Sequence, residues 1–413
     1  MGNGKHLLRS RRLRNLLSYG PQSDWIELLP LNVLIGPNGS GKSNLLAGIG
    51  LLKAAAGDFS GAIERGGGTR NWLWKGVRGE PVAEVSAQLD WPRKDRQKTG
   101  LGVDDVPLRY ELAFTSSDQG LLIESETLGY DKPAPGQPKY LLERTSPPTA
   151  LVHNLKVINT DEGTKPGYSY STLQEPEPDQ PLLSRQPDPI IFPGTGYTAR
   201  QLGAIRLYRD WNIGPESIIR QPRAVARPVR ALDEDCGNLA AVIQALRQDP
   251  SDYHAILEQM KTVYDRVEDL VTLDAGGFAL PALKERGAKS EIPITRWSDG
   301  TLRFLCLVLV LKHPQPPPLV CIEEPELGMH PHIIPTIASL LVEASERTQL
   351  VVTTHSEMLI SALREAPESV LVCEWRENQT TFRRLDARIM KTWLKDSDLG
   401  DLWIRGEIGG TRW

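Results

Sequence analysis

One short segment of the sequence combines glycines, a lysine and a serine in a spacing that suits phosphate chemistry. Residues 31–46, LNVLIGPNGSGKSNLL, predict a buried strand, a glycine-rich loop and the start of a helix. The glycines let backbone N–H groups turn inward around phosphate oxygens, and the helix from Asn44 would point its positive end at the anion. Lys42 would reach the β- and γ-phosphates of a nucleoside triphosphate, and the Ser43 hydroxyl would bind Mg²⁺. The predicted nucleotide contacts in this segment are Gly36, Pro37, Asn38, Gly39, Ser40, Gly41, Lys42, Ser43 and Asn44.

Two adjacent carboxylates end an apolar strand further along the chain. The run PLVCIEEPE, 318–326, predicts a strand whose tip carries Glu323 and Glu324. Glu323 would hold Mg²⁺ directly or through water, and Glu324 would orient or deprotonate an attacking water molecule. The alternative is a solvated acidic strand end, because acidic pairs are common. The phosphate loop upstream favours the catalytic interpretation.

A serine, an aspartate and a glycine stand just before an apolar helix. The run TRWSDGTLRFLCL, 295–307, places Ser298, Asp299 and Gly300 at the predicted start of this helix. Ser298 could serve only as the N-cap. The functional interpretation is an anion-binding helix start that donates to a γ-phosphate.

A histidine ends the strand that follows the acidic pair in sequence. The run VVTTHSE, 351–357, places His355 at the tip of a predicted strand. A lone histidine is usually structural, but this one could reach a γ-phosphate from the neighbouring strand. We therefore predict Lys42, Glu324 and His355 as the catalytic residues.

The composition is that of an ordinary globular protein. The 413 residues are 40% hydrophobic and 24% charged, and the formal net charge of −4 argues against a surface coated in basic charge for nucleic acid. The four cysteines are scattered and show neither metal-ligand spacing nor a disulfide framework, which favours a reducing cytoplasm. No apolar run approaches the roughly 20 residues of a membrane span, and the N-terminus lacks a secretory signal.

The pattern of elements predicts an α/β fold. Strands alternate with helices over 300–375, which is typical of a parallel, doubly wound sheet. Residues 57–130 predict antiparallel strands, and residues 5–17 predict an edge strand. Helical patterning covers 238–271, and no sustained heptad pattern predicts long coiled-coil arms.

The order of these motifs resembles that of an ATP-binding-cassette ATPase. The chain is more similar to the RecF/SMC-like AAA-family ATPases than to transporter subunits, through LNVLIGPNGSGKSNLL, IEEPELGMHP (322–331) and LGDLWIRGEIGG (399–410). The resemblance implies ATP and Mg²⁺ as cofactors, and heads that close in pairs. In such a pair Ser298, Asp299 and Gly300 would contact the nucleotide held by the other chain. Relatives form the ATPase halves of bacterial anti-phage systems of the overcoming-lysogenization-defect, Septu and PARIS types.

The resemblance also sets the expected domain organisation, a single ATPase head over 1–413. Its expected parts are a P-loop lobe with antiparallel strands at 1–130, a loop-rich insertion at 131–200 with one hairpin, a mostly helical subdomain at 201–290, and a lobe with signature, acidic pair and His355 at 291–413.

The chain departs from the transporter pattern at two motifs. Glu323 stands where aspartate is usual, and WSDGT (297–301) stands where LSGGQ is usual, yet both keep the required chemical groups. Gln201 and Gln221 are weak candidates for a Q-loop glutamine. No acidic cluster after His355 would make a full TOPRIM nuclease, so the expected partner is a separate effector, namely a TOPRIM-like or HNH nuclease or a toxin.

Two basic runs leave the question of DNA open. They span Lys5 to Arg14 and the residues Arg220, Arg223, Arg227 and Arg230. Either run could contact a phosphate backbone, but solvated surface charge or a salt bridge inside the head is the favoured interpretation.

We therefore expect a cytoplasmic ATPase switch that forms a homodimer or higher homo-oligomer over two ATP–Mg and controls an effector in anti-phage defence, with no membrane partner. The alternatives are a RecF-like DNA-binding ATPase in DNA repair and a non-catalytic scaffold that keeps ATP bound.

Overall fold

The structure is a computed structural model that divides into two compact units. Unit 1 comprises Arg206–Val370 and Asp386–Glu407, and unit 2 comprises His6–Ile205, Leu371–Leu385 and Ile408–Trp413. The residues that the structure describes are 6–91, 106–133, 139–144, 152–158, 167–173, 177–185, 188–189, 192–225, 229 and 231–411. Lys5, Arg227 and Arg230, which belong to the two predicted basic runs, lie outside the described residues.

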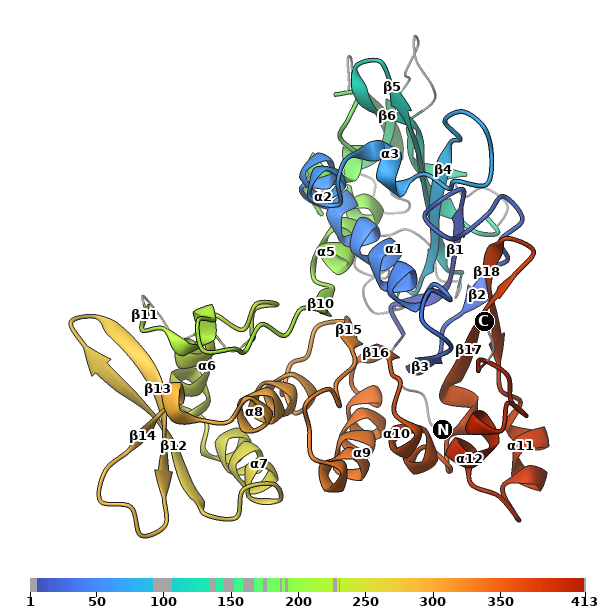
Figure 1. Ribbon diagram of the computed structural model, residues 1–413. Coiled ribbons are helices and arrows are strands. Elements are labelled where there is room, and N and C mark those ends of the chain that lie inside the picture. Colours follow the sequence, from blue (N-terminus) through green and yellow to red (C-terminus); the bar gives the residue numbers. More distant parts are fainter. Residues whose placement is uncertain are drawn as a thin grey trace. The chain divides into compact units, whose positions relative to one another are not determined.

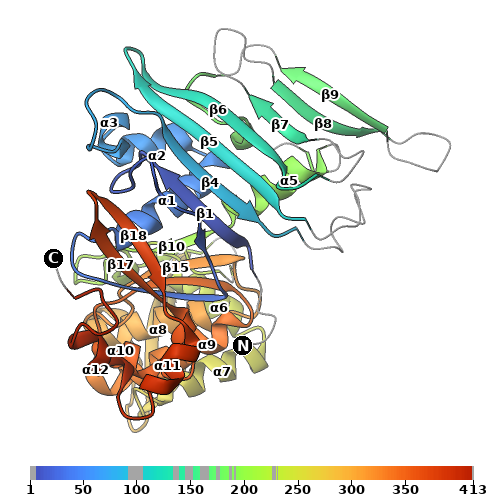
Figure 2. The same ribbon diagram turned by 90° about the vertical axis from the view of Figure 1, so that its right-hand side faces the viewer.

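Unit 2 contains an eight-stranded antiparallel sheet with the strand order β2-β1-β4-β5-β6-β7-β8-β9 (Figure 2). Buried and half-buried side chains alternate along its strands, as in β5, where the buried residues are Leu108, Tyr110, Leu112 and Phe114. The strands are β1 (Leu8–Arg14), β2 (Ile26–Glu27), β4 (Ala83–Leu89), β5 (Leu108–Ser117), β6 (Gly120–Tyr130), β7 (Tyr140–Arg144), β8 (Val152–Ile158) and β9 (Gly167–Leu173).

Helices cover the inner face of this sheet and close the core of unit 2. Figure 2 shows α1, α2 and α5 behind the strands, and α1 packs against α2, α5 and β4. Phe59 of α2 meets Phe114 edge-to-face, with ring centroids 5.4 Å apart. The helices of this unit are α1 (Lys42–Ala55), α2 (Phe59–Arg65), α3 (Thr69–Trp72) and α5 (Pro193–Gly203), with a 3-10 turn η1 (Leu182–Arg185).

Unit 2 also holds the strand that precedes the glycine-rich loop. This strand, β3 (Leu31–Ile35), is buried along its whole length and is followed in its sheet by β17 (Val370–Arg376) and β18 (Gln379–Arg384). β17 and β18 pair antiparallel. The strand that leads into the glycine-rich loop thus lies in a sheet beside β17 and β18, which come more than 300 residues later in the sequence.

Unit 1 carries the acidic pair on a parallel sheet. The strands β10 (Arg206–Tyr208), β15 (Leu319–Glu323) and β16 (Gln349–Thr353) lie side by side in that order and are parallel. Helix α9 packs on β16, α8 and α10, and α10 packs on α12 (Figure 1). These helices are α8 (Asp299–Leu311), α9 (Ile334–Ser345), α10 (Glu357–Ala362), α11 (Ala387–Trp393) and α12 (Leu399–Ile404), with 3-10 turns η4 (Pro331–Ile333) and η5 (Pro367–Ser369).

The rest of unit 1 combines two helices with a small sheet. The two longest strands of the small sheet, β12 and β13, form a hairpin (Figure 1). Helices α6 and α7 pack against β12. The elements are η2 (Ile218–Arg220), β11 (Arg223–Ala224), α6 (Leu239–Leu246), α7 (Pro250–Lys261), β12 (Val267–Ala275), β13 (Phe278–Glu285), β14 (Ile292–Pro293) and η3 (Ile294–Arg296).

The α/β fold, the antiparallel strands within 57–130 and the hairpin of β8 and β9 are confirmed. The helical expectation for 201–290 holds for α6 and α7 but not for 267–285. Helix α7 ends at Lys261, and the following run TVYDRVEDLVTL is rich in β-branched and aromatic residues that suit a strand paired with β13. Among its described residues, the 131–200 segment holds β7, β8, β9, η1 and the start of α5, and the loop-rich insertion stays a prediction.

The predicted edge strand is not at the sheet edge. β1 pairs with β4 on one side, and the two-residue strand β2 pairs with Ser10 and Arg11 on the other. The sequence pattern could not show this, because β2 is too short to be recognised without its partner.

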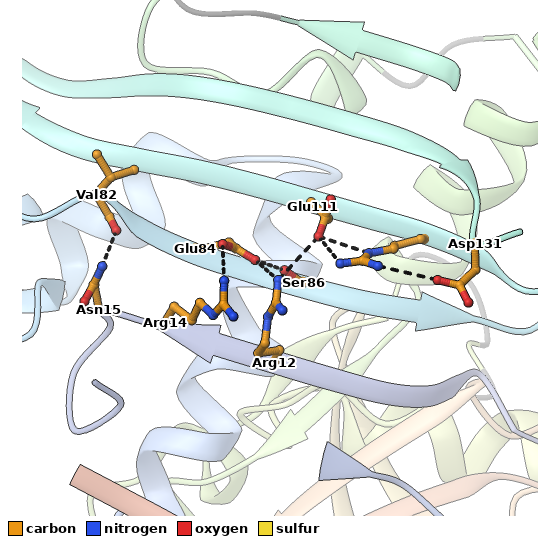
Figure 3. Close-up of polar contacts among 9 residues, drawn as sticks. Arg12, Arg14, Asn15, Val82, Glu84, Ser86, Glu111 and Asp131 are labelled. Carbon is orange, nitrogen blue, oxygen red and sulfur yellow. Dashed lines mark hydrogen bonds and ion pairs between the residues drawn. The ribbon is translucent and has the colours of Figure 1, made fainter. Parts of the chain in front are cut away.

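A stripe of ion pairs runs across the outer face of β1, β4 and β5 (Figure 3). Glu84 pairs with Arg12 at 2.5 Å and with Arg14 at 3.9 Å, and Arg109 pairs with Glu111 at 2.7 Å. The members of this outer stripe are Arg12, Arg14, Glu84, Arg109, Glu111 and Asp131. The N-terminal arginines among them are thus engaged in salt bridges, as the favoured interpretation expected.

Glu84→Gln should destabilise unit 2 in a pH-dependent way. Partial burial alone raises the pKa of Glu84, but hydrogen bonds from Ser86 and Arg12 outweigh it and bring the pKa below its ordinary 4.5. Because the unfolded chain then binds the proton more readily, this stabilisation exists above the ordinary pKa and is lost on acidification. We expect a loss of about 1 kcal/mol at pH 7, or roughly 2–4 °C in melting temperature.

Thermal unfolding at several pH values measures this effect. The difference in melting temperature between wild type and Glu84→Gln should become smaller as the pH is lowered. The exposed Glu64 of α2 offers the control Glu64→Gln. Equal melting of wild type and Glu84→Gln at pH 7 would contradict the prediction.

Candidate functional site

The glycine-rich loop of unit 2 has a backbone that requires its glycines. Gly36, Gly39 and Gly41 have φ angles of 150°, 78° and 105°. A Cβ on Gly36 would lie 2.2 Å from the Cys373 carbonyl oxygen, so a side chain cannot fit there. A Cβ on Gly39 would meet nothing within 4 Å. Its left-handed backbone, rather than packing, is therefore the reason for glycine at position 39.

Side chains of unit 2 hold the carbonyl groups of the loop. The Cys373 thiol donates to the Ser40 carbonyl oxygen at 3.0 Å, and the Thr380 hydroxyl donates to the same oxygen at 2.9 Å. The Tyr19 hydroxyl donates to the Gly41 carbonyl oxygen at 3.2 Å. These three hydrogen bonds hold the loop in place through the carbonyl oxygens of Ser40 and Gly41.

The loop and the start of α1 suit an anion. Lys42 is buried and donates from Nζ to the carbonyl oxygens of Gly36 at 2.7 Å and Pro37 at 3.0 Å. Helix α1 begins without a side-chain cap and has no acidic residue in its first turn. The Ser40 hydroxyl is buried, and no partner for it is found in the described part of the chain. A phosphate chain fits this set of donors.

Other predicted contacts of this loop differ in their surroundings. Asn38, Gly39 and Ser43 are exposed. Asn44 donates from Nδ2 to the Ser18 hydroxyl at 2.8 Å, a bond within unit 2 that ties α1 to the segment before β2.

In unit 1 the acidic pair stands at the end of β15, and its two members have different partners. Glu323 accepts a hydrogen bond from Arg209 Nε at 3.1 Å, and its backbone oxygen accepts one from Trp211 Nε1 at 3.2 Å. Arg209 and Trp211 follow β10, and sequence reasoning missed both because no motif marks them.

Glu324 is the point where the chain turns away from the strand. It has a φ of 45°, which is uncommon for a residue with a side chain. Its N–H donates to the Thr353 carbonyl oxygen at 3.0 Å. The carboxylate Oε1 lies 3.9 Å from Nε2 of His355. The parallel pairing of β15 with β16 thus brings together two of the three predicted catalytic residues.

The predicted signature residues stand at the start of α8. Ser298 is the N-cap, since its Oγ accepts from the Thr301 N–H at 3.1 Å. Asp299 accepts from Arg220 Nη2 at 2.6 Å. A Cβ on Gly300 would lie 3.2 Å from the Gly328 carbonyl oxygen, so this glycine lets the helix approach the turn after β15.

Arg220 fixes the loop that leads into α8. Its side chain is buried and also donates to the carbonyl oxygens of Ile213, Ile294 and Trp297, at 2.8, 2.6 and 3.0 Å. The sequence singled out Arg220 only as part of a basic run. The favoured interpretation was solvated surface charge or a salt bridge inside the head, and for this residue the structure shows the salt bridge, with Asp299.

The metal ligands Ser43 and Glu323 stay a prediction, because Ser43 belongs to unit 2 and Glu323 to unit 1. The described residues contain no group of three or more His, Cys, Asp or Glu side chains placed to hold a metal ion. Likewise, among the helices that the structure describes, none is long and apolar enough to cross a membrane.

Solved structures with a similar fold are head domains of SMC proteins. One is an SMC head bound to the C-winged helix domain of ScpA, with a TM-score of 0.54, 14% identity and coverage of 93% of this chain and 99% of that one. Another is an SMC head with an extended coiled coil, bound to the C-terminal domain of ScpA from Pyrococcus furiosus, with a TM-score of 0.52, 14% identity and coverage of 94% and 99%. At this identity the similarity shows the fold alone.

A comparison with curated proteins gave no match. A family model described as "AAA domain, putative AbiEii toxin, Type IV TA system" matches residues 31–90 and 98–361, which is most of the chain. The matched region includes the glycine-rich loop, the start of α8, the acidic pair and His355. The chain therefore belongs to this family of AAA-type ATPase domains.

Proposed function

We propose that this protein hydrolyses ATP and acts as a nucleotide-controlled switch. The observation that carries the proposal is the pairing of Glu324 with His355 at 3.9 Å, in a chain with a complete P-loop. A carboxylate beside an imidazole at the ends of adjacent parallel strands can accept a proton from water and keep its orientation. Family membership supports the same activity.

Each residue has a proposed role. Lys42, the loop N–H groups and the start of α1 would bind the phosphates, and Ser43 and Glu323 would hold Mg²⁺. When bound, Mg²⁺ supplies positive charge that offsets the charge of the phosphates. Glu324 accepts the proton of the attacking water, and the His355 imidazole orients the reacting groups. Arg209 would have to release Glu323 before that carboxylate could serve the metal.

The proposal includes a pair of heads. Ser298 and Asp299 are exposed at the start of α8, as expected for groups that reach a nucleotide on a second copy of the chain. Closure over two ATP molecules would then control a partner effector, a nuclease or a toxin, in defence against phage. Two similar SMC heads were solved with a ScpA domain bound, which supports an ATPase head that works with a partner protein.

The DNA-repair alternative receives less support. Three arginines of the two basic runs form ion pairs with carboxylates of the same chain, and such pairing reduces the positive charge open to a DNA backbone. The pairs are Arg9–Asp90, Arg12–Glu84 and Arg220–Asp299. We expect ATP turnover that duplex DNA does not stimulate, measured over a range of salt concentrations. Strong stimulation that disappears with increasing salt would favour the alternative, since phosphate contacts are salt-dependent.

Glu324→Gln should separate ATP binding from hydrolysis. The amide cannot accept the proton of water, so turnover should fall by about 10²–10⁴-fold while ATP affinity is kept. Phosphate release and equilibrium ATP binding measure the two properties. The exposed Glu343 of α9, paired with Lys312, offers the control Glu343→Gln. Unchanged turnover in Glu324→Gln would reject the assignment and favour the non-catalytic scaffold.

Lys42→Ala should act on binding instead. The loss of the ammonium group removes a charged donor to phosphate, so ATP affinity should fall by roughly tenfold to a hundredfold. Lys53→Ala in the last turn of the same helix is the control. ATP binding by Lys42→Ala at wild-type affinity would contradict a role of the loop in holding phosphate.

A further inference from the structure

A third glutamate follows the acidic pair and contacts the segment that carries His355. Glu326 Oε1 accepts a hydrogen bond from the Thr354 hydroxyl at 2.5 Å and another from the His355 N–H at 3.2 Å. The Thr354 hydroxyl in turn accepts from the Ser356 N–H at 2.9 Å. One carboxyl oxygen thus binds the His355 N–H directly and the Ser356 N–H through the Thr354 hydroxyl.

Glu326 is half-buried, and neighbouring groups of the chain hold its carboxyl group. Burial raises its pKa, against the hydrogen bonds from Thr354 and His355, and the nearby Glu324 raises it further. Its second oxygen, Oε2, is buried, and the described part of the chain offers it no hydrogen-bond partner. Both hydrogen bonds are therefore accepted by Oε1. The two donors require an oxygen acceptor at that position, which a neutral side chain can also supply.

The turn that contains Glu326 is also attached to α8. Arg303 Nη1 donates to the Leu327 carbonyl oxygen at 2.6 Å, and Gly300 lies against the Gly328 carbonyl oxygen. The short segment Glu326–Gly328 thus contacts His355 at one end and the start of α8 at the other. All of these residues belong to unit 1.

We propose that Glu326 is a positioning residue that holds His355 beside Glu324 through the acceptor Oε1. The inference rests on the proposed ATPase function and adds a residue to it. The His355 Nε2 atom lies 3.9 Å from Glu324 Oε1, and the Glu326 side chain accepts a hydrogen bond from the backbone N–H of that histidine. Misplacement of a reacting group by about 1 Å can cost up to a hundredfold in rate.

Three substitutions of Glu326 separate its position from its charge. Glu326→Gln removes the charge and keeps an acceptor at Oε1. Glu326→Asp keeps the charge but withdraws the oxygen by one methylene group. Glu326→Ala removes both. Glu343→Ala on α9 removes an exposed glutamate of the same unit and is the matched control.

Hydrogen exchange without nucleotide reads the contact directly. In Glu326→Ala and Glu326→Asp, the amides of 354–357 should exchange at least about tenfold faster, because the His355 N–H loses its acceptor. Glu326→Gln should stay near the wild-type rate, as should the amides of β15 in every variant. Wild-type exchange of 354–357 in both Glu326→Ala and Glu326→Asp would overturn the proposal.

Steady-state kinetics reads the consequence. We expect kcat to fall at least about tenfold in Glu326→Ala and Glu326→Asp, with KM within about threefold and with Glu326→Gln close to wild type. If Glu326→Asp is active and Glu326→Gln is not, the charge rather than the position matters and the proposal fails. A wild-type protein without ATP turnover would remove the proposed function, and the exchange rates would still decide whether Glu326 holds His355.

Discussion

The left-handed turn at Glu324 is the constraint on which the acidic end of β15 depends. Such a backbone costs a residue with a side chain on the order of 1 kcal/mol or more, and the hydrogen bond to the Thr353 carbonyl oxygen offsets part of that cost. The turn separates two consecutive glutamates, so that Glu323 faces Arg209 and Glu324 faces His355. One strand end thereby supplies two carboxylates with different surroundings.

The two units use different means to fix their predicted functional groups. In unit 2 the glycine-rich loop is held by Tyr19, Cys373 and Thr380, of which the last two come from the far end of the sequence. In unit 1 the buried Arg220 and the half-buried Glu326 hold backbone groups around the start of α8 and around His355. The buried guanidinium of Arg220 would be costly to leave unsatisfied, and its four bonds fix the loop that leads into α8.

The sequence was informative where chemistry depends on local spacing. The P-loop, the acidic pair and the histidine lie on short, continuous motifs whose strands and helices have strong patterns. Arg209, Arg220 and the acceptor role of Glu326 could not be found in this way, since their partners are distant in sequence and only the fold brings them together. The strand β12 was missed because the helix was predicted to continue past Lys261, although the residues that follow suit a strand, and their pairing with β13 shows it.

The proposed closure of two heads over ATP can be tested by the solution mass of the Glu324→Gln chain with and without ATP and Mg²⁺. Without the catalytic carboxylate, bound ATP should persist and keep the closed pair together. We expect the mass to double from the 45.8 kDa of one chain only when ATP and Mg²⁺ are both present. A mass that does not respond to ATP, or a large assembly already formed without it, would rule out closure of two heads driven by ATP.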